Sequence, residues 1–222
     1  MLWAIYYHIK TIVGQWNIQK RLLEIWLVYE LREFSINRIR SGGANMDALK
    51  KEEIFTVDDI YALPDGERAE LIDGKIYYMA PPNRTHQRIL LSLSRIIADY
   101  IDSKNGDCEI NIAPFAVFLN KDDVNYVEPD ISVVCDPSKL DEKGCHGAPD
   151  WVIEIVSPGN KTMDYFTKLF KYRNANVREY WIVDPTKELI MVYRFEKETM
   201  EQYSFDEDVP VGIYEGFTIK VR

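Results

Sequence analysis

The hydrophobic pattern of this chain alternates between the period of a helix and that of a strand. In THQRILLSLSRIIADYIDSK (residues 85–104), Ile89, Leu93, Ile97 and Tyr100 recur at helical spacing, which predicts a long helix. TMDYFTKLFKYRNA (residues 162–175) predicts a second amphipathic helix. FTVDDIYALPDG predicts a short one that begins with Thr56 as its cap.

Strands account for most of the remaining pattern. AELIDGKIYYMA predicts a hairpin about Asp73-Gly74, and CEINIAPFAVFL predicts a strand with an irregularity at its proline. DISVVC and WVIEIV are continuously apolar, as expected of strands covered on both faces. EYWIVD, ELIMVYRFE and MEQYSF predict a meander. The order of elements predicts an α+β domain with α/β-like character, in which helices pack on a mixed sheet.

The first 45 residues differ from the rest of the chain. They are apolar and aromatic, but charged residues interrupt every window long enough to span a bilayer, and no signal-peptide cleavage site follows. One interpretation is a pair of amphipathic helices packed on the domain or on a partner. Another is an over-extended start, because Gly-Gly-Ala-Asn-Met can be encoded by a purine-rich GGAGG shortly before an ATG. We therefore divide the chain into an extension (1–45) and a domain (46–222).

Composition narrows the classes of protein. A length of 222 residues with 46% hydrophobic content is enough for one substantial domain. The net charge of -9 weighs against a protein that coats DNA non-specifically, but not against an enzyme with acidic metal ligands. The three cysteines, Cys108, Cys135 and Cys145, are an odd number without a secretory signal, which indicates reduced thiols in a cytoplasmic protein that is not bound to a membrane.

Two carboxylates fall where strand side chains should be dry. Asp130 opens the strand ISVV, and Glu154 lies in the middle of WVIEIV, on the face opposite Trp151 and Ile153. If the two strands are neighbours, both acids can reach one ion. Two carboxylates, the backbone carbonyl of Ile155 and water would suit Mg²⁺. The structural alternative is that Asp130 caps a turn and Glu154 pairs with an arginine.

These residues carry a resemblance. Pro129-Asp130 followed by Glu154-Ile155-Val156 resembles the PD-(D/E)XK nuclease superfamily. The blocks ERAELIDGKIYYMAPPNRTHQRI, VEPDISVV, WVIEIVSPGNKTMDYFTKLFKYRNANVREYWIVDP and VGIYEGFTI look like the Uma-type restriction endonuclease family of bacteria, over roughly Glu52 to Val221. The resemblance implies a restriction-endonuclease-like mixed sheet flanked by helices, Mg²⁺ (or Mn²⁺) as cofactor, DNA as substrate and a homodimer.

The resemblance also assigns roles to residues. Asp130 and Glu154 match the metal ligands of the family, and Glu70 matches an additional acid that aligns the metal or its water. His86 falls at a polar position often occupied by histidine in such proteins, although a histidine near a helix start is more often a cap or a core partner. These roles are expectations that the resemblance implies.

One position departs from the superfamily pattern. A lysine is expected two residues after the second acid, where this chain has Val156. The following helix offers a substitute, because Asp164, Lys168 and Tyr172 share one face at i, i+4 and i+8. Lys161, on the preceding loop, is the competing candidate. The plain alternative for Lys168 is an ion pair with Asp164.

Three functions remain open from the sequence. The leading hypothesis is a magnesium-dependent endonuclease that hydrolyses DNA. The second is a non-catalytic nucleic-acid-binding or assembly module that retains the nuclease fold. The third is a metal-dependent hydrolase of another phosphodiester, RNA included.

The N-terminal segment generates the first prediction. A chain that starts at Met46 is expected to match the full chain in solubility and melting temperature, because every predicted element of the domain lies beyond it. Thermal unfolding of the two chains side by side is the measurement. Aggregation of the shorter chain, or a large loss of melting temperature, would show that residues 1–45 belong to the core.

Overall fold

The computed structural model describes residues 53–120, 122–157 and 163–221. Six strands form its central sheet: β3 (Glu109–Ile112), β5 (Ile131–Val134), β8 (Trp151–Ile155), β9 (Glu179–Asp184), β10 (Leu189–Arg194) and β11 (Thr199–Ser204). Their order across the sheet is β11-β10-β9-β8-β5-β3. Neighbours run antiparallel except β8 and β9, which are parallel. The sheet is therefore mixed, as predicted.

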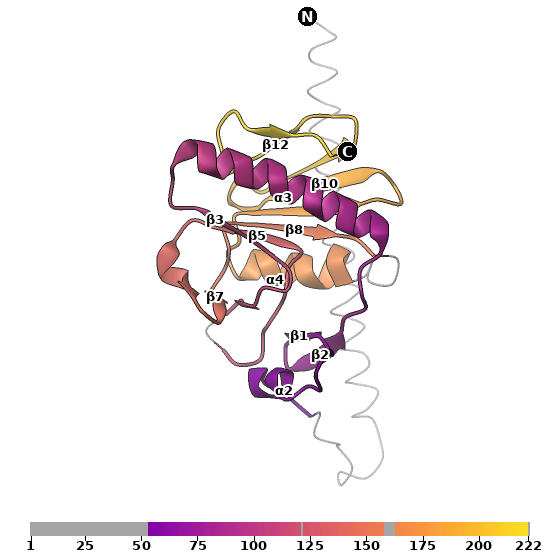
Figure 1. The fold of residues 1–222 in the computed structure, drawn as a ribbon, viewed down its shortest axis with the longest axis vertical. Helices are drawn as coiled ribbons and strands as arrows, with labels where there is room; N and C mark the ends of the chain where they lie inside the picture. Colours follow the sequence, from indigo (N-terminus) through magenta and orange to yellow (C-terminus); the bar gives the residue numbers. More distant parts are fainter. Residues whose placement is uncertain (1–52, 121, 158–162, 222) are drawn as a thin grey trace, which may run out of the picture. The chain divides into compact units, whose positions relative to one another are not determined.

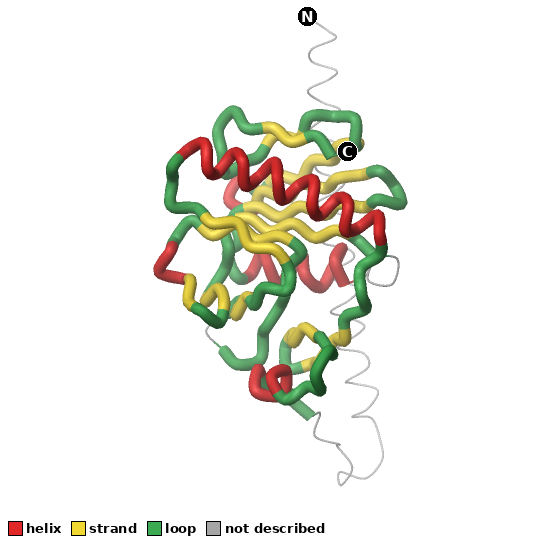
Figure 2. Tube along the Cα trace, in the orientation of Figure 1, coloured by secondary structure: helices red, strands yellow, loops and turns green. Residues whose placement is uncertain are grey.

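Helices cover both faces of this sheet (Figure 1, Figure 2). The long helix α3 (Arg84–Lys104) lies along one face, and α4 (Lys168–Asn174) lies along the other. Because strand side chains alternate, each strand contributes to two cores. None of the helices in the described ranges is long and apolar enough to cross a membrane. The predicted α+β class is confirmed.

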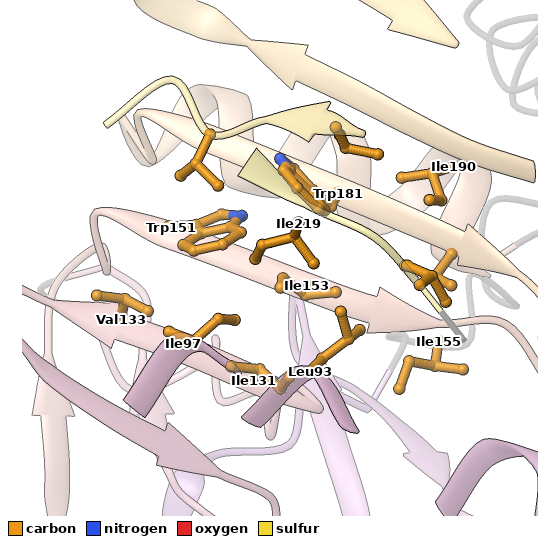
Figure 3. Close-up of a cluster of buried hydrophobic side chains, with 14 of the residues drawn as sticks. Leu93, Ile97, Ile131, Val133, Trp151, Ile153, Ile155, Trp181, Ile190 and Ile219 are labelled. Atoms are coloured by element: carbon orange, nitrogen blue, oxygen red, sulfur yellow. The ribbon is translucent and has the colours of Figure 1, made fainter. Parts of the chain in front are cut away.

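Strand β8 shows how the alternation sorts side chains. Trp151, Ile153 and Ile155 pack with α3 in one fully buried cluster. Val152 and Val156 pack with Leu169 and Tyr172 of α4 in the other. Figure 3 shows Trp151 and Ile153 together with Leu93 of α3 and Trp181 of β9. The predicted division of this strand into two faces is confirmed, and it places Glu154 on the α4 side.

A smaller unit carries the N-terminal part of the described chain. Helix α2 (Val57–Tyr61) is followed by the antiparallel hairpin β1 (Ala69–Ile72) and β2 (Lys75–Tyr78). Asp73 and Gly74 form its turn with φ of 51° and 72°, a left-handed conformation that suits this pair of residues. The backbone N–H of Thr56 donates to Asp59 at 2.7 Å, which supports the predicted start of α2.

Further short elements complete the fold. A three-stranded sheet contains β4 (Val117–Phe118), β6 (Leu140–Asp141) and β7 (Gly144–His146), and a two-stranded sheet contains β12 (Val209–Pro210) and β13 (Thr218–Ile219). The short helices are η1 (Pro137–Lys139), η2 (Met163–Thr167) and η3 (Phe195–Lys197).

An extended segment joins the hairpin to the central sheet. Tyr126 pairs with Leu71 of β1, with backbone hydrogen bonds of 2.7 and 2.8 Å, and Val127 pairs with Val117 of β4. The chain then passes through Glu128 and Asp130 directly into β5. This route brings β1, which carries Glu70, to the N-terminal end of β5.

Two predicted elements differ in detail. CEINIAPFAVFL is not one strand, because it divides into β3 and β4 around Pro114, which has no N–H to donate to a ladder. The helix over residues 162–175 is not uniform, because it begins as the π-helix η2 and becomes α-helical at Lys168. The predicted boundary at Met46 lies outside the described residues.

The expectation of reduced thiols is wrong for two of the three cysteines. Cys108 and Cys135 form a disulfide, while Cys145 is free and buried. The antiparallel register pairs Glu109 with Val134, so the next residues outward on the two strands are these cysteines. A separation of 27 residues in the sequence conceals this proximity. The inference of a reducing compartment thereby loses its support.

Candidate active site

Asp130 directly precedes the first residue of β5, at the end of that strand that lies beside β8. The last pair in the register is Ile131 with Ile153, so β8 continues past the end of its partner. Asp130 Oδ2 accepts the backbone N–H of Ile155 at 2.8 Å. The side chain of Asp130 therefore satisfies a strand N–H that the shorter neighbour does not reach, and this fixes the carboxylate at the end of the sheet.

His86 holds Asp130 from the other side. Its Nε2 lies 3.0 Å from Asp130 Oδ2, and its ring is buried in the first turn of α3. The backbone N–H of His86 donates to Asn83, the N-cap of that helix, at 2.9 Å. Within the described residues Asp130 Oδ1 accepts no hydrogen bond, and the side chain is 15% exposed. Asp130 is thus positioned through one oxygen and open through the other.

Glu154 lies inside β8 and faces α4. Its Oε1 accepts hydrogen bonds from Lys168 Nζ at 2.9 Å and from the Tyr172 hydroxyl at 2.7 Å. Burial, followed by the charges of Glu154 and Glu70, raises the pKa of Tyr172 well above its ordinary value of 10.0. The hydroxyl therefore stays protonated at neutral pH and remains a donor to the carboxylate.

Lys168 joins Glu154 to a second buried acid. Its Nζ is also 2.9 Å from Glu70 Oε1, and the side chains of Lys168, Glu70 and Glu154 are each 5% exposed. Glu70 Oε1 accepts the backbone N–H of Glu128 at 3.0 Å as well. One ammonium is thus shared by two carboxylates from β1 and β8. Burying these charges is tolerated because the ammonium offsets part of the negative charge and the three groups are hydrogen-bonded.

The helix that supplies Lys168 has an irregular start. The π-helix η2 ends at Thr167, and Lys168 is the first residue of α4. π-Helical turns are rare and occur frequently at functional sites. The predicted helix face brings both Lys168 and Tyr172 to Glu154. Lys161, the competing lysine, lies outside the described part of the chain. So does the side chain of Asp164, the alternative partner of Lys168.

A solvent-connected cavity of about 80 Å³ joins these groups. Its lining includes Glu70, His86, Asp130, Glu154 and Lys168, to which the sequence analysis gave candidate roles. Ile155, whose backbone carbonyl was expected to be a metal ligand, also lines it. Residues from α3, β8, α4 and the hairpin strand β1 therefore meet in one polar cavity.

The cavity contains two charged residues that the sequence analysis missed, Arg68 and Glu128. Arg68 Nε donates to Glu128 Oε2 at 2.9 Å, and the Tyr126 hydroxyl donates to Glu128 Oε1 at 2.8 Å. A signal was present in the sequence, because each residue precedes a predicted site acid by two positions. In extended chain such residues lie on the same side.

The number of carboxylates at the site limits how Mg²⁺ could be held there. Magnesium is usually held by one or two carboxylates and keeps several waters. No group of three or more His, Cys, Asp or Glu side chains is placed to hold a metal ion in the ranges described. A magnesium ion held by Asp130, with Oδ1 uncommitted, and by Glu154 would therefore have to keep water as most of its ligands.

The mixed sheet between helical layers, with an acidic cavity at the strand ends, is a nuclease-like fold. A crystal structure from Anabaena variabilis, described as a "putative nuclease belonging to DUF820", matches with a TM-score of 0.59 and 25% identity, over 72% of this chain and 90% of that one. An uncharacterized protein of Synechocystis sp. is 31% identical over 128 residues, which are 57% of this chain and 66% of that protein. The match thus covers slightly less than two thirds of that relative.

Family membership follows from a longer match. The chain belongs to the Uma2 family, described as "Putative restriction endonuclease", whose model matches residues 57–222. The resemblance noted from the sequence blocks is confirmed.

The buried hydroxyl of Tyr172 generates a prediction of stability. Tyr172→Phe is expected to lower the free energy of unfolding by about 1.5–3 kcal/mol, because it removes a hydrogen bond to a buried carboxylate. Urea denaturation is the measurement. Tyr193→Phe is the matched control, since Tyr193 is buried and its hydroxyl makes no hydrogen bond to the described residues. Equal losses in the two variants would contradict the role assigned to Tyr172.

Proposed function

We propose that this protein is a magnesium-dependent endonuclease that hydrolyses phosphodiester bonds of DNA. The observation that carries the proposal is the convergence of Asp130, Glu154 and Lys168 on one polar cavity. A pair of carboxylates can hold a divalent cation, and an ammonium beside them can stabilise negative charge. Membership of the Uma2 family supports the nuclease class.

Each residue has a distinct part in this proposal. Asp130 and Glu154 bind the cation, with the Ile155 carbonyl as a further oxygen donor. When bound, the divalent cation supplies positive charge beside the scissile phosphate and lowers the pKa of an attacking water. Lys168 orients that water or stabilises the charge that develops on the phosphate oxygens. Glu70 positions the Lys168 ammonium, and His86 positions Asp130.

DNA cleavage on both strands suits two-fold symmetry, so we propose a homodimer as the active form. One observation favours a second candidate, the non-catalytic module. Lys168 already neutralises part of the negative charge of Glu70 and Glu154 without any metal. Magnesium titration by calorimetry separates the two candidates, because the enzyme requires a specific metal site and the module does not.

The proposed activity predicts metal-dependent cleavage. The purified protein is expected to nick or cut DNA with Mg²⁺ or Mn²⁺, while Ca²⁺ binds without supporting turnover. Asp130→Asn and Glu154→Gln should each remove activity, because each deletes one negative charge that neutralises the metal. Asp99→Asn, an exposed acid on α3, is the matched control and should cut normally. Full activity in both site variants would overturn the assignment.

Lys168 is expected to act on the chemical step. Lys168→Met should lower the single-turnover rate by orders of magnitude while metal affinity is kept or increased, because a transition-state contact is lost and a competing cation is removed. The substitution removes the ammonium that two buried carboxylates share, so Glu70→Gln/Lys168→Met restores the charge balance for a folded comparison. Lys161→Ala should change the rate far less. A normal rate in the folded double variant would refute the role of Lys168.

A further inference from the structure

The side chains that line the polar cavity carry an excess of negative charge. Four carboxylates line it, Glu70, Glu128, Asp130 and Glu154, against the guanidinium of Arg68 and the ammonium of Lys168. Without a bound cation, the excess of carboxylates repels a phosphodiester. Lys168 offers little help with initial binding, because its ammonium is 5% exposed and bonded to two acids. An exposed cation at the entrance would meet the approaching phosphate first.

Arg68 lines the cavity and has that exposure. Its side chain is 37% exposed, against 9% for its partner Glu128. Nε and Nη2 both contact one oxygen of Glu128, Oε2. The third guanidinium nitrogen, Nη1, makes no hydrogen bond or ion pair with the described residues. A guanidinium carries five N–H donors, so donors remain for an anion.

Glu128 holds this guanidinium in place. Its second oxygen accepts the Tyr126 hydroxyl at 2.8 Å, and its backbone N–H donates to Glu70 at 3.0 Å. Burial and the hydrogen bond to Glu128 raise the pKa of Tyr126 above its usual range, so this donor persists. Glu128 is therefore fixed through side chain and main chain. An arginine oriented by a fixed carboxylate loses less freedom when it binds a ligand.

We propose that Arg68 is a phosphate-binding residue of this cavity, held by buried Glu128 so that its free N–H donors contact a non-bridging oxygen of the DNA backbone. The inference rests on the proposed function and adds to it the group that first binds the substrate. It accounts for a partly exposed arginine beside four acids.

Salt dependence of DNA binding tests the inference. Each phosphate contact contributes about 0.9 to the slope of log affinity against log salt. Binding of a short DNA duplex, measured by fluorescence anisotropy with Ca²⁺ in place of Mg²⁺, should weaken about ten-fold in Arg68→Gln. The slope should fall by about 0.9 units. In Mg²⁺, KM should rise more than kcat falls, because the lost contact contributes to binding before chemistry.

Glu128→Gln is the matched control. It removes the negative charge of the partner but keeps the cation and a side-chain oxygen that can accept its N–H groups, so its slope should equal that of wild type. Melting temperatures report folding in both variants. Two outcomes overturn the inference alone: an unchanged slope in Arg68→Gln, or an equal loss of slope in Glu128→Gln. If the wild-type protein binds no DNA at any salt concentration, both the role of Arg68 and the proposed function are wrong.

Discussion

The ammonium of Lys168, held between the carboxylates of Glu70 and Glu154, is the interaction on which the site depends. It connects the β1–β2 hairpin, the central strand β8 and helix α4, three elements that are separate in sequence. Ions this deeply buried cost several kcal/mol each unless they are paired and hydrogen-bonded. The pairing therefore constrains the positions of all three elements, and loss of one member would leave another charge buried without compensation.

The same arrangement recurs around the cavity with other partners. Asp130 is fixed by His86 and by a strand N–H, and Arg68 is fixed by Glu128. Asp130, Glu154, Lys168 and Arg68 are thus each held by a second group that is itself buried. Such preorganisation reduces the reorganisation needed when charge develops on a substrate. It is the physical connection between the packing of this domain and the function that we propose for it.

The position of the lysine illustrates how geometry replaces sequence spacing. Strand β8 has Val156 where the superfamily pattern expects a lysine, and Val156 is packed in the core beneath α4. The cation comes instead from the start of α4 and reaches the same carboxylate at 2.9 Å. An electrostatic contact needs only a charge at the right point, so strand and helix can supply it equally well. A rule based only on sequence spacing would reject this site, although a lysine does reach the carboxylate of Glu154.

Local pattern determined the elements of this protein, because alternation and helical spacing report which side of each element is buried. From that information the sequence predicted the α+β class and the two faces of β8. It also predicted that Asp130 and Glu154 converge if β5 and β8 are neighbours, and both acids line one cavity. Only the tertiary structure decided which distant residues meet. The contact of Arg68 with Glu128 and the disulfide of Cys108 with Cys135 depend on strand order and register. These are fixed by packing of the whole chain, since side chains in any one stretch specify burial but not the neighbour that provides it.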